Sequence, residues 1–179
     1  MNLPFIIDQF KSQCQALGLK PTEDWLYASI EAQKIFHMKG DALHTSYPIS
    51  TSKNPPSCIE DSFGTPWGMH KIGEKIGDGA PLGSVFRGRI LSGTTYWEEL
   101  EEEQAKSLIT TRILRLHGLE PAVNQGPGRD TFERYVYIHG TNKEDAIGTP
   151  ASKGCLQMTN EDVIRLFDNI PEGTLLWIQ

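Results

Sequence analysis

The sequence predicts a mainly β domain with one helix at its N-terminal end and a second helix close to its C-terminal end. Three observations predict this class. Apolar residues recur at helical spacing over residues 4–17, and from Trp25 onward short strand-like runs are separated by turn residues. Thr159 and Asp162 then form a capping-box pattern that predicts a helix over residues 161–170. At 179 residues the chain suits one domain that buries its core without metal or disulfide support.

The N-terminal helix is predicted from apolar residues that share one face, namely Phe5, Ile6, Phe10, Cys14 and Leu17. Gly18 and Pro21 follow, and both residue types end helices. We therefore divide the chain into a helical segment, residues 1–22, packed on a domain formed by residues 23–179.

The strands are predicted from runs of alternating or apolar residues bounded by Gly, Pro, Asn or Asp. They cover residues 25–38, 42–51, 65–90 (a glycine-rich, hairpin-like pair), 107–120, 133–140 and 173–179. The acidic run at 94–107 is interpreted as a solvated helix or flap rather than a cation site. Gly77 to Gly79 is not predicted to be a phosphate loop, because no Lys-Ser/Thr pair follows it.

Composition narrows the class of partner and the cellular compartment. A net charge of −6 disfavours a nucleic-acid partner, and no apolar run reaches the 18 residues of a membrane span. The first residues lack the basic region of a secretory signal, so we expect a cytoplasmic protein if Met1 is the natural start, and a periplasmic or secreted one if a leader was trimmed. Three cysteines without a CxxC pair predict reduced thiols, and no metal or cofactor is expected.

Cys155 and His139 are the candidate reactive pair. His139 ends the strand-like run "YVYI", and Cys155 begins "CLQM", so a loop between two neighbouring strand ends would bring their side chains together. A thiol nucleophile needs such a base, and the amides of Gly154 and Cys155 are natural donors to a developing oxyanion. The alternative is that Cys155 is a small core residue, the commoner role of a free cysteine.

Several motifs in order resemble the YkuD-type L,D-transpeptidase family over residues 25–179. "YASIEAQKIFHMKGDALHTSYPISTS" is similar to the family's opening hairpin, and "TPWGMH" is similar to its T-P-x-G-x-F element. "IHGT" followed by "SKGCLQM" resembles its signature H-G-T…S-H-G-C-h-R-h. The resemblance implies the β-sandwich of that catalytic domain, with an N-terminal helix and a helix after the cysteine.

The same resemblance implies roles for individual residues. Cys155 would be the nucleophile, His139 its base, and the carbonyl of Gly140 would orient the imidazole. Ser152 and Gly154 would join Cys155 in contacting the oxyanion and substrate. The implied reaction is attack on the L,D peptide bond after the diamino acid of a peptidoglycan stem, which releases a terminal D-Ala and leaves an acyl-enzyme.

The sequence departs from the family signature at two positions. Lys153 stands where the signature has histidine, and Gln157 stands where it has arginine. Lys153 either favours the Cys155 thiolate or points to solvent, and with the signature arginine absent a substrate carboxylate needs another anchor. The candidates for the anchor and for other substrate contacts are Arg112, Arg115, Arg134, Gln157 and His70. The remaining histidines (His37, His44, His117) and cysteines (Cys14, Cys58) are interpreted as structural.

The acceptor of the acyl group distinguishes three functions. Water gives an L,D-carboxypeptidase that trims tetrapeptide stems in muropeptide recycling, the function favoured by the absent signal. An amine gives a transpeptidase that joins two stems or attaches a protein. A silent peptidoglycan-binding module is the third alternative, although the retention of His139, Gly154 and Cys155 argues against it. In each case the partner is a peptidoglycan stem peptide or muropeptide, and the oligomeric state is not predicted.

Overall fold

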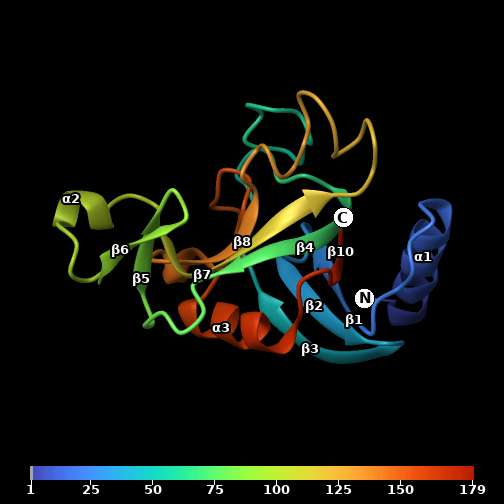
Figure 1. Cartoon of the computed structure of the whole chain (residues 1–179), viewed down its shortest axis with the longest axis horizontal. Helices are drawn as coiled ribbons and strands as arrows, with labels where there is room; N and C mark the ends of the chain where they lie inside the picture. The colour runs from blue at the N-terminus through green and yellow to red at the C-terminus, as the bar shows by residue number, and fades with distance from the viewer. Residues whose placement is uncertain (1) are drawn as a thin grey trace.

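The computed structural model describes residues 2–179, in which ten strands form one hydrogen-bonded sheet with flanking helices (Figure 1). The strands are β1 (Asp24–Ser29), β2 (Lys34–Lys39), β3 (Ala42–Pro48), β4 (Gly68–Ile76), β5 (Ser84–Arg87), β6 (Ile90–Thr95), β7 (Ile109–Gly118), β8 (Tyr137–Thr141), β9 (Leu156–Met158) and β10 (Leu175–Ile178). The helices are α1 (Leu3–Ala16), α2 (Glu101–Gln104) and α3 (Asn160–Asn169), with a 3-10 turn at Glu144–Ala146. The mainly β class and both predicted helices are confirmed.

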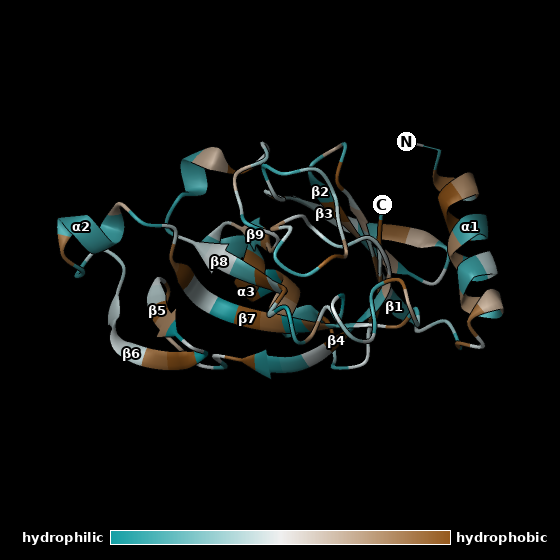
Figure 2. Cartoon of the chain, turned by 90° about the horizontal axis from the view of Figure 1, so that it is seen from above, coloured by the Kyte–Doolittle hydropathy of each residue, from teal (hydrophilic) through white to brown (hydrophobic). Residues whose placement is uncertain are grey.

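The strand order is β3-β2-β1-β10-β4-β7-β5-β6, and β8 pairs with β7 and with β9. In Figures 1 and 2, α1 and α2 lie at opposite ends of the molecule, and α3 lies beneath the centre of the sheet in Figure 1. Across the part of the chain that the structure describes, no helix is long and apolar enough to cross a membrane.

Helix α1 packs on the sheet through one apolar stripe. The side chain of Asn2 caps it by accepting from the amide of Phe5, and Ile6, Ile7, Phe10 and Cys14 are buried. The prediction that Phe5 belongs to this stripe is wrong, since Phe5 is 58% exposed and Ile7 is buried instead. Positions 6, 7, 10 and 14 follow the spacing of three and four residues that one helix face requires. Met1, where the predicted segment 1–22 begins, lies outside the described residues.

Phe10 is expected to hold α1 on the sheet. Its ring stacks on Trp25 of β1 with the ring centroids 3.8 Å apart, and its side chain is 1% exposed. Phe10→Ala should lower the free energy of unfolding by about 3–5 kcal/mol, because it removes a buried ring and leaves a cavity. Urea unfolding measures this, and the exposed Phe5→Ala should change the same quantity by less than about 0.5 kcal/mol. Equal losses in the two variants would contradict the packing described.

The predicted single strand over residues 25–38 is wrong, because it divides into the antiparallel pair β1 and β2. The turn between them contains Gln33, whose side chain bonds the carbonyl of Ile30 and the hydroxyl of Thr51. Both strands are buried on their two faces, one face against α1 and the other against the main core. A strand covered on both sides has no clean alternation to mark its ends.

The glycine-rich segment 65–90 does not form a hairpin-like pair either. Strands β4 and β5 both pair with β7, and the hairpin in this region joins β5 to β6. The acidic run at 94–107 ends β6 and forms α2, where Arg87 makes ion pairs with Glu99 and Glu103. In Figure 2 this end of the molecule combines the mostly hydrophilic α2 with an apolar start of β6, and large apolar side chains are exposed there (Ile90, Leu91, Trp97, Leu100).

Helix α3 packs against one face of the central strands β7, β8 and β9. Thr159 caps it by accepting from the amide of Asp162 at 3.2 Å, as its sequence pattern predicts. Val163, Leu166 and Phe167 pack into the main core together with side chains of β7, β8 and β9. The three strands around the candidate site therefore all pack on α3.

Candidate active site

The pairing of β8 with β9 places Cys155 and His139 on one face of the sheet. The two strands are parallel, with Ile138 opposite Leu156 and His139 opposite Gln157. Because side chains alternate along a strand, Ile138 and Leu156 enter the main core while His139 points to the other face. Cys155 packs on that other face, against a cluster that contains Tyr137. Cys155 and His139 are therefore diagonal neighbours on adjacent strands.

His139 is held as a neutral imidazole. Its side chain is 3% exposed, and its Nδ1 donates to the carbonyl oxygen of Gly140 at 2.7 Å, the contact that the family resemblance implies. Burial lowers the pKa of His139 to about 4, against a smaller opposite effect of that hydrogen bond. With the proton fixed on Nδ1, Nε2 is the nitrogen that can accept one, and it makes no hydrogen bond to any residue in 2–179.

Gly140 has no room for a side chain. A Cβ at this position would lie 2.7 Å from both the side-chain oxygen of Asn160 and the carbonyl oxygen of Thr110. Asn160 also bonds the hydroxyls of Thr110 and Thr111 and, through its amide nitrogen, the carbonyl of Thr141. This buried network fixes the backbone on both sides of the Gly140 carbonyl. Asn160 was not predicted from the sequence to support the site. The available signal was an Asn at the first position of the helix that follows Cys155.

Cys155 lines a cavity of about 260 Å³ and is partly exposed. Burial of the thiol raises the pKa of Cys155 to about 11, while a backbone hydrogen bond and the charge of Arg134 act in the opposite direction. Its Sγ lies 3.7 Å from the carbonyl oxygen of Tyr135, whose φ of 55° is a strained value for a residue with a side chain. At neutral pH the free site therefore holds a thiol beside a neutral imidazole.

The turn before Cys155 is held by its own hydrogen bonds. The hydroxyl of Ser152 donates to the carbonyl of Cys155 at 2.6 Å, and the amide of Gly154 donates to the hydroxyl oxygen of Ser152 at 3.2 Å. Gly154 has a φ of 123°, which a residue with a side chain rarely adopts. In the free site the Gly154 amide, which was predicted as an oxyanion donor, is therefore directed to Ser152. Lys153 is exposed and lines the cavity beside Cys155.

Of the three candidate arginines, the structure brings Arg134 to the cavity and places Arg112 and Arg115 elsewhere. Arg112 is buried, donates to the carbonyls of Ala80 and Thr111, and lies over the ring of Phe167 in α3. Arg115 pairs with Glu74 at 3.0 Å and stacks 3.6 Å from the centre of the Phe132 ring. The prediction that these two bind substrate is therefore wrong.

His70 and Gln157 also lie away from the cavity. His70 is fully buried, with its ring nitrogens 2.9 Å from the carbonyl of Gly68 and 3.1 Å from the hydroxyl of Thr131. Burial lowers the pKa of His70 to about 4. Gln157 is buried and donates to the hydroxyl of Ser107 at 2.9 Å. Both are corrected from substrate contacts to structural residues.

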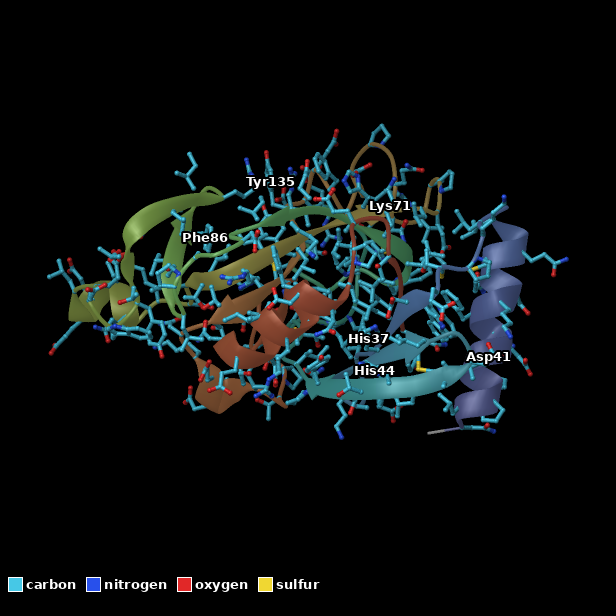
Figure 3. The ribbon with its side chains drawn as sticks, turned by 60° about the horizontal axis from the view of Figure 1, so that its bottom comes forward. His37, Asp41, His44, Lys71, Phe86 and Tyr135 are labelled. Carbon is cyan, nitrogen blue, oxygen red and sulfur yellow. The ribbon has the colours of Figure 1, made fainter. Side chains whose placement is uncertain are left out.

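None of the other histidines and cysteines among residues 2–179 lines the cavity at Cys155. His37 is fully buried and bonds Asp24 at 2.6 Å, and in Figure 3 both His37 and His44 lie on the opposite side of the molecule from Tyr135. His117 stacks on Phe132. Cys14 and Cys58 are buried. Within residues 2–179 no group of three His, Cys, Asp or Glu side chains is arranged to hold a metal ion.

Two loops wall the cavity, and sequence analysis did not single them out. One loop contributes Glu60, Asp61 and Phe63, and the other contributes residues 133–136. The amide of Glu60 donates to the carbonyl of Gly128, and Arg134 bonds the first loop directly. Both loops rise above the sheet at the top of Figure 1. The two loops are held together by contacts between segments far apart in the chain, which local sequence patterns do not predict.

A cavity-lining cysteine next to a buried, carbonyl-oriented histidine on a β scaffold is the arrangement of thiol–imidazole acyl-transfer sites. The chain belongs to the YkuD family, the L,D-transpeptidase catalytic domain, whose family model matches residues 23–178.

Several named proteins match this chain over short segments of 45 to 50 residues. L,D-transpeptidase YqjB of Bacillus subtilis is 44% identical over 50 residues, 28% of each chain. L,D-transpeptidase YkuD of the same organism is 51% identical over 46 residues, 26% of this chain and 28% of the relative. ErfK/SrfK of Escherichia coli is 47% identical over 45 residues, 25% of this chain and 14% of the relative. The matches thus span less than a third of each relative's length.

Solved structures show the same fold over most of the chain. An L,D-transpeptidase from Mycobacterium smegmatis superposes with a TM-score of 0.54 at 16% identity, covering 88% of this chain and 58% of that one. The C442S mutant of the Enterococcus faecium L,D-transpeptidase gives a TM-score of 0.53 at 15% identity, covering 89% of this chain and 50% of that one. At these identities the likeness concerns the fold.

Proposed function

We propose that this domain cleaves the L,D peptide bond between the diamino acid and D-Ala of a peptidoglycan tetrapeptide stem, with Cys155 as the nucleophile. The observation that carries the proposal is Cys155 at the cavity wall, placed by the β8–β9 register diagonally from His139, whose Nδ1 is held by the Gly140 carbonyl. In the free site the thiol lies against the Tyr135 carbonyl, so the proposed attack requires it to turn toward Nε2 of His139 when substrate binds. Such catalytic hydrogen bonds often tighten only in the substrate complex.

The proposed steps begin from a neutral Cys155 thiol and a neutral His139 imidazole. Nε2 of His139 takes the thiol proton as Sγ attacks the carbonyl carbon of the diamino acid, which forms a tetrahedral oxyanion. The C–N bond then breaks, the imidazolium returns the proton to the amine of D-Ala, and a thioester remains. Water activated by His139 attacks the thioester, which releases a tripeptide carboxylate and restores the thiol.

Water is the proposed acceptor because the cavity at Cys155 is small. At about 260 Å³ it is smaller than the pockets of roughly 300–1,000 Å³ that enclose drug-sized ligands. It suits the end of one stem peptide rather than two. The product would be a trimmed stem, as an L,D-carboxypeptidase of muropeptide recycling makes.

A second candidate, transpeptidation, is favoured by one specific observation. Another cavity of about 270 Å³ adjoins the first and shares Phe63 and Lys153 with it. It is lined on its far side by Ser52, Lys53 and Asn54. An acceptor stem bound there would bring its amine to the thioester in place of water.

Mass spectrometry of a purified disaccharide tetrapeptide in H₂¹⁸O, with and without a second stem, tests both candidates. We expect loss of one D-Ala and one ¹⁸O atom in the tripeptide product, whether or not a second stem is present. Cross-linked dimers without ¹⁸O would support the transpeptidase instead. An unchanged substrate with no covalent adduct would overturn the proposed reaction and leave a silent binding module.

A further inference from the structure

Two cations line the cavity at Cys155 among residues 2–179, Arg134 and Lys153. This matters because a stem with a free C-terminal D-Ala carries a carboxylate close to the bond that breaks. Standard bond lengths place the carboxylate carbon at most about 4 Å from the scissile carbon. A group that binds this carboxylate must therefore lie in the same cavity as the thiol.

Arg134 is the pre-organised one of the two cations. Its guanidinium donates to the carbonyl of Ser57 at 3.0 Å and to that of Gly64 at 2.8 Å, with a longer contact of 3.4 Å to the hydroxyl of Ser62. These bonds fix its plane before substrate arrives, so little side-chain entropy is lost on binding. Lys153 is exposed on a flexible stem, and ordering it would oppose binding.

The charge of Arg134 lacks an anionic partner. Its hydrogen bonds go to neutral oxygens, and no carboxylate lies within 4 Å of it in the part of the chain that the structure describes. The acidic residues of the cavity wall, Glu60, Asp61 and Glu133, are exposed, so water screens them. Burial takes part of the solvation from the Arg134 guanidinium and lowers its pKa, against smaller opposite effects of Cys58, Cys155 and Glu60. A carboxylate in the cavity would complete that solvation.

We propose that Arg134 binds the C-terminal carboxylate of the substrate, and that the domain therefore selects stems that end in a free D-amino acid. This inference rests on the proposed function. It assigns the carboxylate contact to Arg134 and not to Gln157, which is buried and donates to the hydroxyl of Ser107. It also makes the loop of residues 57–64 part of the specificity site, because that loop fixes the guanidinium.

The test compares a tetrapeptide stem with the same peptide carrying a C-terminal amide. For the wild-type protein we expect kcat/KM to be at least tenfold higher on the acid. In Arg134→Met the ratio should fall to near 1, because activity on the acid should fall more than activity on the amide. Arg134→Lys should keep an intermediate ratio, since it retains the charge without the planar fork.

Two variants serve as controls. Arg129→Gln removes a partly exposed arginine of the neighbouring loop, which donates to the Ala122 carbonyl, and should leave the ratio unchanged. Lys153→Met removes the other cation of the cavity and should lower the ratio less than Arg134→Met does. A collapse of the ratio in Lys153→Met alone would assign the carboxylate to Lys153 and overturn the proposal. Equal wild-type rates on acid and amide would also overturn it, as would equal loss on both substrates in Arg134→Met.

Binding separates this proposal from the proposed function. Isothermal titration of the Cys155→Ala protein with the acid and the amide measures recognition without turnover. Tighter binding of the acid that disappears in Cys155→Ala/Arg134→Met supports the carboxylate site even if the wild-type protein cleaves neither peptide. Equal binding of the two peptides by the Cys155→Ala protein would reject it.

Discussion

Cys155→Ala is expected to lower turnover of a stem tetrapeptide by at least about 10³-fold, because the thioester cannot form without sulfur. The domain should keep its fold. The Cys155 side chain is partly exposed at the edge of a small apolar cluster, and its contact with the Tyr135 carbonyl is long at 3.7 Å. Replacing sulfur by hydrogen therefore removes little packing. Turnover is followed by mass spectrometry, and the fold by thermal unfolding.

The other two cysteines are matched controls for this result. Cys14 is 1% exposed beneath α1, and Cys58 is 6% exposed with its thiol 3.6 Å from the Trp67 carbonyl. Cys14→Ala and Cys58→Ala should leave kcat within a few-fold, and iodoacetamide should modify Cys155 first in the folded protein. Half of the wild-type activity remaining in Cys155→Ala would exclude a thiol mechanism.

Local signals in the sequence were enough to predict the helices. The capping pattern at Thr159 and the apolar spacing before Gly18 each depend on residues within one or two turns. The β1–β2 turn was missed because the strands on both sides of it are buried on two faces, and no glycine or proline marks it. The pairing of β4 and β5 through β7 joins segments distant in the chain, which local pattern does not encode.

The candidate site also contains some features that local sequence predicts and others that it does not. The place of His139 at a strand end and of Cys155 at the start of the next strand is a short-range feature, and the register of β8 and β9 puts them on one face. Which arginine reaches the cavity was not predictable from the sequence. Thr111 has a φ of 67° within an irregular stretch of β7, and the following Arg112 lies beside Phe167 of α3 rather than near Cys155. Arg134 is fixed by carbonyls of a loop about seventy residues earlier in the chain.

Two buried histidines link the site to the stability of the whole domain. Burial lowers the pKa of His139 and of His70 to about 4 in the folded protein, whereas the ordinary value is 6.5. Between these values the unfolded chain binds a proton at each histidine and the folded chain does not. Stability is therefore fully present above pH 6.5 and is lost as the pH falls toward 4. Burial also lowers the pKa of His37, which adds an effect of the same sign.

Lowering the pH from 7 to 5 is expected to reduce the free energy of unfolding by about 2 kcal/mol for each of these two histidines, or about 4 kcal/mol together. That is a large part of the roughly 5–15 kcal/mol that stabilises a typical domain. Urea unfolding at several pH values measures the slope of the unfolding free energy against pH. NMR titration of the histidine rings should show both side chains still neutral at pH 5.5 in the folded protein.

His70→Gln should flatten the slope of the unfolding free energy against pH by nearly one proton, even though it removes the contacts with Gly68 and Thr131. This is because the slope reports the difference in bound protons and not the total stability. An unchanged slope in His70→Gln, or ring protonation near pH 6.5 in the folded state, would contradict a neutral, buried pair.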